Sequence, residues 1–246
     1  MQKFILKQFE VLCGLRMHSI DVIIATYGCE SWKEKALIAQ NSVLRQTSPA
    51  SSIHLIHGET LAQARNEGAQ KSTAEWLLFL DADDALDSNF IHAMREKIDQ
   101  TTQYSSPLLY PSVLTIEKGG KPSSAKISVQ KPILEGNFMV IGTLVKRENF
   151  LQLGGFRELP MYEDWDLWIR CIANGSTPNP VPRAVYHVFV NSNSRNHQPQ
   201  TTADKIRDSF LQEYWHKVYN QPLPRFPHFS LYVKKRTRKL KKVFQF

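Results

Sequence analysis

The sequence contains little cysteine and no long apolar run. Its three cysteines, Cys13, Cys29 and Cys171, are widely spaced and form no CxxC pair. This pattern predicts reduced thiols, with neither a disulfide framework nor a cysteine zinc site. No apolar stretch approaches the roughly 20 residues that cross a bilayer, and Lys7 and Glu10 interrupt the N-terminal segment. We therefore expect a cytoplasmic chain with no signal peptide and no transmembrane helix.

The chain also lacks a low-complexity tract and an evenly distributed excess of charge. Its 246 residues are 42% apolar, enough for one large core. The net charge is +8, but seven of the cations lie within residues 234–242, which leaves about +1 for the rest. Because the basicity is local, we expect no nucleic-acid-binding body.

This distribution of charge predicts three parts: an N-terminal extension over 1–16, one domain over 17–225 and a basic C-terminal tail over 226–246. The tail contains apolar residues at spacings that form a narrow stripe: Val233, Leu240, Val243 and Phe244. Such a stripe among cations suits the anionic inner face of a membrane, and peripheral attachment there is one expectation. The alternative is a solvated basic tail.

Strand and helix patterns alternate over the first hundred residues. The segments 19–25, 53–57 and 76–80 are short, apolar and rich in strand formers, and two segments with helical spacing, 32–45 and 61–71, separate them. This alternation predicts an α/β fold, a single Rossmann-like domain whose mostly parallel central sheet is flanked by helices. Ligands of such sheets bind outside the carboxyl ends of the strands.

Three carboxylates follow the third predicted strand. Asp81, Asp83 and Asp84 would repel one another unless a cation neutralised them, and carboxylate oxygens are preferred ligands of Mg²⁺ or Mn²⁺. We therefore predict a divalent cation held by Asp81 and Asp83; a solvated acidic turn is the alternative. An EF-hand is excluded, since Ala85 and Leu86 occupy its fifth and sixth places. A phosphatase of the haloacid dehalogenase type, with Asp81 as nucleophile, remains as a second function.

The second half of the chain is less regular. Residues 100–135 are polar, with one plausible strand over 108–115, and we interpret them as a variable insertion or mobile loops. Residues 138–147 are predicted as a strand. Asp87 or Ser88 is expected to be the N-cap of a helix that includes Phe90.

A further helix is indicated by EDWDLWIRCIANG, residues 163–175. Its apolar positions recur at i, i+3, i+4 and i+7, and the expected C-terminal stop is Gly175. The stripe consists of Trp165, Trp168, Ile169 and Ile172. Glu163 and Asp164 lie at the N-terminus of this helix, where the helix dipole favours ionised carboxylates, and Asp166 is expected to pair with Arg170.

Four motifs in order carry a resemblance to a known family. SIDVIIATYG, LAQARNEGAQKSTAEWLLFLDADDAL, LGGF and EDWDLWIRC resemble the ordered motifs of the family 2 glycosyltransferases with the GT-A fold. The resemblance covers residues 19 to about 195. It implies transfer of a sugar, mostly with inversion, from a nucleoside diphosphate donor, here expected to be a UDP-sugar, to a saccharide or lipid-linked acceptor in cell-surface polysaccharide synthesis.

The resemblance also implies roles for individual residues. Asp81 and Asp83 would bind Mn²⁺ or Mg²⁺ and the diphosphate, and Asp164 would be the catalytic base beside Glu163. The donor's nucleotide would be contacted by Thr26, Tyr27, Arg65, Asn66 and Asp81. A third metal ligand is expected at His187, the alternative being a strand histidine satisfied by its neighbours.

One segment departs from the family pattern. The family usually follows its second strand with an Asp-rich turn, a helix and another strand, whereas this chain runs almost directly from residue 57 to the helix at 61–71. His57 and Glu59 are the polar residues left there, each with a structural role as the alternative. A non-catalytic nucleotide-sugar-binding relative is therefore a third hypothesis.

Overall fold

The computed structural model describes residues 17–101, 106–117, 120–190 and 200–223. The predicted extension over 1–16 and basic tail over 226–246 lie outside these residues, as does the apolar stripe assigned to the tail. Within the described part, no helix is long and apolar enough to cross a membrane. Two described cysteines, Cys29 and Cys171, are free thiols, as the sequence predicts for them.

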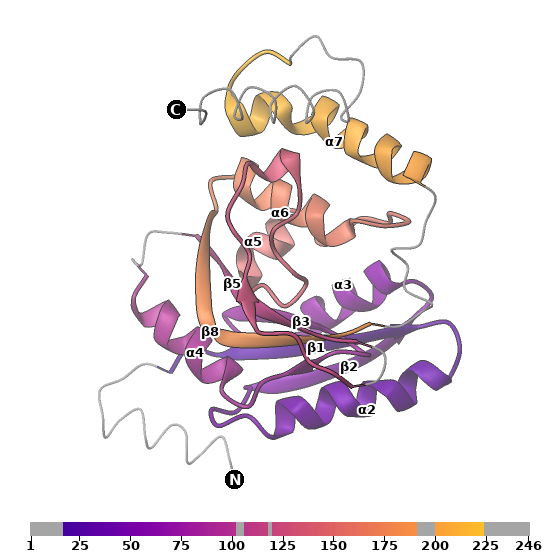
Figure 1. Cartoon of the computed structure of the whole chain (residues 1–246), viewed down its shortest axis with the longest axis vertical. Coiled ribbons are helices and arrows are strands. Elements are labelled where there is room, and N and C mark those ends of the chain that lie inside the picture. Colours follow the sequence, from indigo (N-terminus) through magenta and orange to yellow (C-terminus); the bar gives the residue numbers. More distant parts are fainter. Residues whose placement is uncertain (1–16, 102–105, 118–119, 191–199, 224–246) are drawn as a thin grey trace.

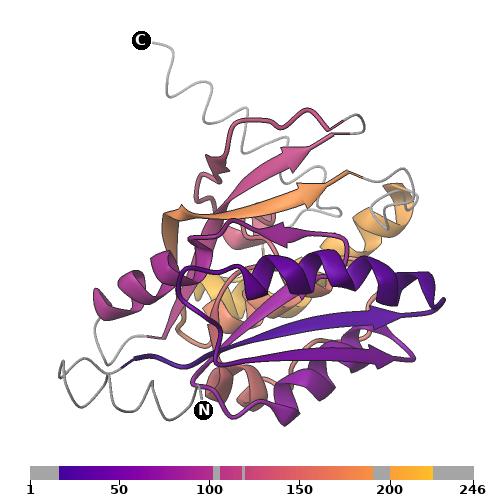
Figure 2. The same cartoon turned by 90° about the horizontal axis from the view of Figure 1, so that it is seen from below.

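The first sheet has the strand order β2-β1-β3-β7. Its bounds are β1 Ile20–Tyr27, β2 Ser52–Gly58, β3 Trp76–Asp81 and β7 Val145–Lys146. β1 pairs in parallel with both β2 and β3, and β7 is antiparallel to β3. The helix α2 (Ser31–Leu44) covers one face and α3 (Leu61–Lys71) covers the other, as Figures 1 and 2 show. The alternating pattern of the first hundred residues is thus confirmed.

Close packing of α3 on the sheet depends on one glycine. A Cβ at Gly68 would lie 2.5 Å from Ile23 Cγ2, which is inside van der Waals contact. The small residue therefore lets α3 approach β1 and hold its own residue 65 at the carboxyl end of the sheet.

The second sheet has the order β4-β8-β5-β6. Its bounds are β4 Ala85–Leu86, β5 Pro107–Ile116, β6 Lys126–Ile127 and β8 Thr177–Phe189. β5 and β8 are parallel, and β4 and β6 add antiparallel edges. The helix α4 (Phe90–Asp99) packs on β8. It begins one or two residues later than predicted, with Asn89 as N-cap, and Asp87 Oδ1 instead accepts the Asn89 N–H at 3.0 Å.

The strand predicted over 108–115 is confirmed as β5, whose first six residues are buried and which lies in the middle of the second sheet, so this part of 100–135 is not a loop insertion. Another prediction for this half is wrong. Residues 138–147 are not one strand: Val145–Lys146 forms β7, Leu144 makes an isolated bridge with Leu109 of β5, and the Thr143 N–H closes a turn on the Val140 carbonyl. The apolar run is buried as irregular chain between the sheets, so burial rather than pairing accounts for its composition.

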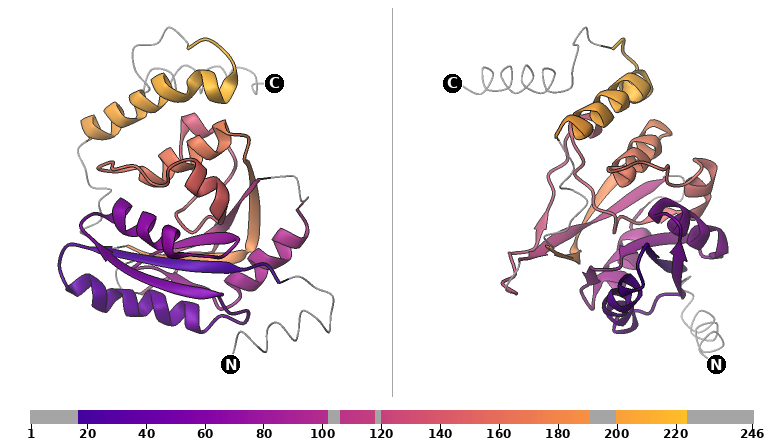
Figure 3. Two further views of the ribbon diagram at one scale, coloured as in Figure 1. Left: turned by 180° about the vertical axis from the view of Figure 1, so that it is seen from behind. Right: turned by 90° about the vertical axis from the view of Figure 1, so that its right-hand side faces the viewer.

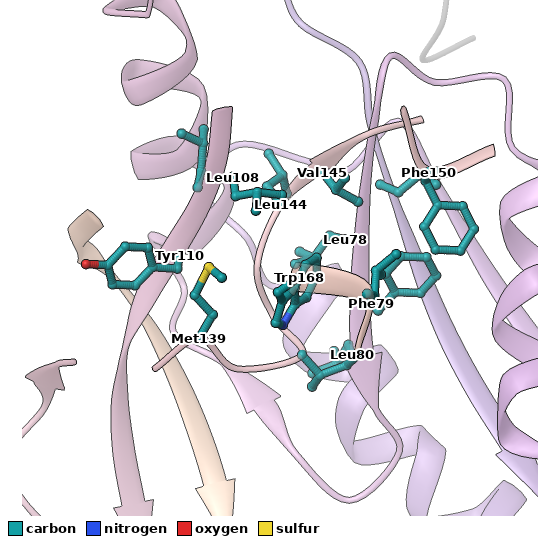
Figure 4. Close-up of a cluster of buried hydrophobic side chains, with 14 of the residues drawn as sticks. Leu78, Phe79, Leu80, Leu108, Tyr110, Met139, Leu144, Val145, Phe150 and Trp168 are labelled. Atoms are coloured by element: carbon teal, nitrogen blue, oxygen red, sulfur yellow. The ribbon is translucent and has the colours of Figure 1, made fainter. Parts of the chain in front are cut away.

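The core joins the two sheets. Figure 4 shows side chains of β3 among those of β5, of the irregular segment before β7, of α5 (Arg147–Gln152) and of α6 (Glu163–Ala173). Trp165 and Trp168 are buried, which confirms the predicted apolar stripe of α6. Gly175, with φ of 91°, ends this helix as predicted.

A helix that the sequence analysis did not identify, α7 (Gln200–Tyr219), covers α6 from outside. Figure 3 shows it lying along α6 on the side away from the first sheet. It also contacts the short helix η1 (Ile133–Glu135). α7 therefore packs against α6, the helix that carries Glu163 and Asp164.

Candidate functional site

A cavity of about 800 Å³ lies at the carboxyl ends of β1 and β3, within the usual size range of small-molecule sites. The sheet register sets Asp81 beside Ala25, one residue before Thr26. The start of α6 completes the wall, 82 positions further along the chain than Asp81. Seven of the residues predicted to form the site line this cavity: Thr26, Tyr27, Arg65, Asp81, Asp83, Glu163 and Asp164.

Arg65 joins the two acidic parts of the cavity. Its guanidinium, which is 3% exposed, donates to Asp81 Oδ1 at 2.5 Å and to Glu163 Oε1 at 2.8 Å. The ring of Phe156 lies below it, 5.0 Å from the guanidinium carbon. Sequence reasoning assigned Arg65 to the nucleotide pocket. In the structure it lines the cavity, but both ends of its fork bind carboxylates of the protein.

Asp164 is held at the cavity wall by two hydrogen bonds. Its Oδ1 accepts the Trp165 backbone N–H at 2.7 Å, and its Oδ2 accepts from Asn137 Nδ2 at 3.0 Å. Burial, assisted by the negative charge of Glu163, raises the pKa of Asp164 to about 6, although the Trp165 N–H and Arg65 act in the opposite direction. A carboxyl group with a pKa near 6 is basic enough to take up a proton and is still ionised near neutral pH.

Glu163 and Asp164 are adjacent in sequence, but their carboxylates bind different partners. Glu163 is 6% exposed and its carboxylate is bound to Arg65. The residue before it, Tyr162, has φ of 66° and ψ of 24°, a left-handed conformation that costs a non-glycine residue about 1 to 3 kcal/mol. Arg207 of α7 donates to Tyr162 Oη at 2.9 Å, so α7 contributes to holding this turn.

The loop before α6 is anchored from several sides. Arg170 donates to the Leu153 and Gly155 carbonyls at 2.8 and 2.6 Å. It also pairs with Asp166, as the sequence predicted. Arg157 reaches α7, where it donates to Glu213 at 2.9 Å. Sequence analysis alone did not predict this network, because α7 was not recognised.

Asn66 departs from its predicted role. Its Nδ2 donates to the Phe156 carbonyl at 2.9 Å, and its Oδ1 accepts the Phe156 N–H at 2.8 Å. Both ends of the amide are therefore used to fasten the 153–156 loop, and Asn66 does not line the cavity. The sequence places Asn66 next to Arg65 on α3, but helical geometry turns adjacent side chains about 100° apart.

His187 also lies outside the cavity lining, whereas the following residues Val188, Phe189 and Val190 form part of it. It lies in β8 opposite Ala85 of β4 and Leu114 of β5. This position agrees with the alternative reading as a strand histidine. Its predicted role as a third metal ligand receives no support from the described residues, among which no group of three His, Cys, Asp or Glu side chains forms a metal site.

Asp84 is a further buried carboxyl group whose role the sequence did not reveal. Its Oδ1 accepts the Phe189 N–H at 3.0 Å, which ties the acidic loop to β8. Nearby, the Asp81 N–H donates to Tyr186 Oη at 3.2 Å. Burial, together with the charges of Asp81 and Asp83, raises the pKa of Asp84 to about 8. The crowding that the sequence implied is therefore present.

This donor set fits a hard divalent cation. Asp81 and Asp83 both reach the cavity, and the unfavourable charge beside Asp84 is the kind that a cation relieves. Two carboxylates are few for a protein-only site, but Mg²⁺ usually keeps several waters and binds through one or two carboxylates together with substrate phosphates. The residues present therefore fit a cation whose shell a diphosphate completes.

The end of β2 and the short connection after it also contribute to the site. A hydrogen bond of 3.0 Å joins His57 Nδ1 to Thr26 Oγ1, whose residue lines the cavity. Glu59 is exposed, and its N–H donates to Gln63 Oε1 at 3.0 Å. His57 thus supports a cavity residue, and Glu59 begins the turn into α3.

Comparison with known proteins agrees with this geometry. Residues 35–112 match the family model "Glycosyl transferase family 2". A Haemophilus influenzae protein described as an uncharacterized glycosyltransferase is 24% identical over 200 residues, covering 77% of this chain and 66% of the relative. The crystal structure of S. aureus TarS matches with a TM-score of 0.58 at 16% identity, covering 81% of this chain and 41% of TarS.

A shorter form, TarS 1–349 in complex with UDP-GlcNAc, matches with a TM-score of 0.60 at 13% identity, over 81% of this chain and 69% of that one. The predicted α/β, GT-A-like fold is thus shared with a solved glycosyltransferase. The chain spans about two thirds of the curated relative and less than half of the longer TarS chain. The family model over residues 35–112, the relative and the shared fold all agree with the resemblance to glycosyltransferase family 2.

Proposed function

We propose that this protein transfers a sugar from a UDP-sugar to a hydroxyl group of a saccharide or lipid-linked acceptor, with inversion of the anomeric carbon and with a divalent cation. The observation that carries the proposal is the convergence of two acidic groups on one cavity. Asp81 and Asp83 come from the end of β3, and Asp164 comes from the start of α6. The first pair suits a cation and a diphosphate, and the second suits a proton acceptor.

The transfer is a single displacement. The acceptor oxygen attacks the anomeric carbon, and the bond between that carbon and the diphosphate oxygen breaks, so that the diphosphate leaves with the electron pair. The proton of the acceptor hydroxyl passes to Asp164 Oδ2 or Oδ1, and attack from the face opposite the leaving group inverts the centre. A base with a pKa of about 6 is suited to this proton transfer.

The other residues orient and separate these groups. Arg65 holds Glu163 away from the base position and fixes Asp81 at the strand end. Asn137 orients Asp164 through the hydrogen bond to Oδ2. A bound Mg²⁺ or Mn²⁺ would be held by Asp81 and Asp83 and would stabilise negative charge on the departing diphosphate.

The choice of donor is supported by the TarS complex with UDP-GlcNAc, a structure with the same fold. An acceptor in a cell-surface polysaccharide is part of the proposal and rests on the family resemblance. The phosphatase alternative fits less well, since Asp81 would have to attack phosphorus while bound to the buried Arg65 at 2.5 Å.

The test is an assay of purified protein with UDP-sugars, a panel of saccharide and lipid-linked acceptors, and Mn²⁺ or Mg²⁺. We expect release of UDP that depends on an acceptor and the cation, with a glycosylated product of inverted configuration. Hydrolysis of phosphomonoesters without any acceptor would support the phosphatase instead. Binding of a UDP-sugar without turnover on any acceptor would support a non-catalytic relative.

A further inference from the structure

The charges that line the cavity are unbalanced. Among the residues that the structure describes, five carboxyl groups and two cationic side chains reach it. The carboxyl groups belong to Asp81, Asp83, Asp84, Glu163 and Asp164, and the cations to Arg65 and Lys35. A donor diphosphate adds more negative charge to this wall. The binding of such a ligand therefore depends on whichever cations are free to meet it.

Arg65 is not free. It is buried, and its two outer nitrogens donate to Asp81 and Glu163. The positive charge of Arg65 is thus neutralised by two carboxylates of the protein. Lys35, on the first turns of α2, is exposed, and no carboxylate of the described residues lies within ion-pair distance of its Nζ. The neighbouring Lys33 differs, since it forms an ion pair with Glu30 at 2.8 Å and does not line the cavity.

Lys35 is nevertheless held in a defined position. Its Nζ lies 4.1 Å from the centroid of the Trp32 ring, within the range of a cation–π interaction. The Trp32 side chain packs against the core and lines the same cavity, and the Trp32 backbone N–H donates to the Cys29 carbonyl at 3.1 Å. An indole that is itself anchored therefore presents the ammonium group at the cavity wall and limits its rotational freedom.

This arrangement also indicates which ligand group meets Lys35. The ammonium covers a face of Trp32, so that face is not available for stacking by a base. An ammonium group offers three donors and no acceptor, and phosphoryl oxygens are a common partner of lysine in proteins. A cavity of about 800 Å³ equals a sphere of roughly 12 Å diameter, so a phosphate near its centre lies within about one Debye length of the wall.

We propose that Lys35, held over Trp32, binds a phosphoryl group of the nucleoside diphosphate donor and supplies the positive charge that Arg65 cannot. The proposal rests on the proposed function, since it assumes a nucleoside diphosphate in this cavity. It adds a donor-binding residue from α2, outside the strand ends and the acidic loop to which the sequence motifs point.

The test compares ligands that differ in phosphate against variants that differ in charge. UDP, GDP, ADP and TDP are titrated calorimetrically into wild type with Mn²⁺, and the tightest is carried forward with its nucleoside. Lys35→Met removes the charge and keeps an unbranched side chain, and Lys35→Arg keeps the charge. Lys33→Met is the matched control, with the same change of charge two positions away on the same helix.

We expect Lys35→Met to bind the diphosphate roughly tenfold more weakly, as for loss of one charged hydrogen bond. Binding of the nucleoside should stay within twofold, Lys35→Arg should recover most of the affinity, and Lys33→Met should match wild type. Unchanged diphosphate affinity in Lys35→Met overturns the inference. An equal loss for the nucleoside, or an equal loss in Lys33→Met, overturns it as well. If wild type binds none of the four diphosphates, the proposed function fails with it.

Discussion

The Arg65 guanidinium lies 2.8 Å from Glu163 Oε1 while its other outer nitrogen lies 2.5 Å from Asp81 Oδ1. One buried cation therefore connects the end of β3 to the start of α6, two elements 82 positions apart in sequence. The consequence concerns the adjacent pair at the start of α6. Glu163 is committed to this ion pair, which leaves Asp164 as the carboxylate that can receive a proton.

Replacing Arg65 by Met should destabilise the fold strongly. The change leaves the buried Glu163 without this cation, and breaking a buried ion pair by removing one partner typically costs about 3 to 5 kcal/mol. We expect a loss in this range in the free energy of unfolding, measured by urea titration without metal.

The control for this change is the double variant Arg65→Met with Glu163→Leu. Removing both charged partners should recover much of the loss, because well-packed apolar replacements of buried pairs are often neutral. A single variant that loses less than about 1 kcal/mol would contradict the bridging role of Arg65.

Replacing Asp164 by Asn should remove the proton acceptor while keeping the shape of the side chain. General-base losses are typically about 10²- to 10⁴-fold in rate, and we expect kcat to fall by this amount. The dissociation constant for the donor should change little, since the cation site is on another element. An Asp164→Asn protein with near-normal transfer would exclude Asp164 as the base.

Asp166→Asn is the matched control on the same helix. Asp166 is 1% exposed and accepts from Arg170 and Tyr214, so its replacement should cost stability in the range of a few kcal/mol. Its effect on the rate at a temperature where the variant is folded should be far smaller than that of Asp164→Asn.

The raised pKa of Asp164 links activity and stability in opposite directions. In the folded protein this pKa is about 6, above the ordinary value of 3.8, so the folded state holds the proton more tightly than the unfolded chain does. The stabilising effect is fully present below about pH 4 and is lost as the pH rises through 6. The base must be ionised, so the transfer rate should rise over the same interval to a plateau above pH 6.

Two measurements check this linkage. Relative to Asp164→Asn, wild type should lose about 1 to 3 kcal/mol of stability between pH 4 and pH 7. The pH profile of kcat/KM should have an acidic limb with an apparent pKa near 6. A limb near pH 4, together with equal stability profiles, would show that the carboxyl group is not perturbed.

The first half of this fold could be predicted from sequence because its signals are local. β1 and β3 are short apolar runs, and the acidic residues follow β3 directly, so strand position alone predicted that Asp81 lies at the binding edge. The stripe of Trp165 and Trp168 has helical spacing that burial confirms. At these positions the apolar residues that produce the local pattern are the same residues that the folded protein buries.

The second half depends on contacts that no local pattern encodes. The run that includes Met139 and Ile141 is apolar because these side chains are buried, although it does not pair as a strand. The sequence of α7 does have a helical pattern, because its buried residues Ala203, Phe210 and Tyr214 recur at helical spacing. This spacing alone predicts a helix there. That α7 braces the start of α6 follows only from the three-dimensional arrangement.

For Asn66, the sequence motif and the structure imply different roles. The motif next to Arg65 implied contact with the nucleotide, whereas the structure uses both ends of its amide on Phe156. Asn66→Ala should cost about 1 to 3 kcal/mol of stability, as expected when buried backbone groups lose partners. Its dissociation constant for the nucleoside diphosphate should remain near that of wild type, and a tenfold loss of affinity without destabilisation would restore the nucleotide role.

The last prediction concerns the acidic loop after β3, where Asp83 lines the cavity and Asp87 does not. If Asp81 and Asp83 hold a divalent cation with the donor, a chelator should weaken nucleoside diphosphate binding by wild type, and Asp83→Ala should weaken it by a similar factor. Chelator should then have little further effect on Asp83→Ala, because both changes remove the same interaction. Asp87→Ala is the control: Asp87 Oδ1 accepts only the Asn89 N–H among the described contacts, so loss of this one hydrogen bond should cost about 1 kcal/mol of stability and leave binding and its cation dependence intact. Binding that is indifferent to chelator in wild type, with no change in Asp83→Ala, would show that the loop serves the fold and not a cation.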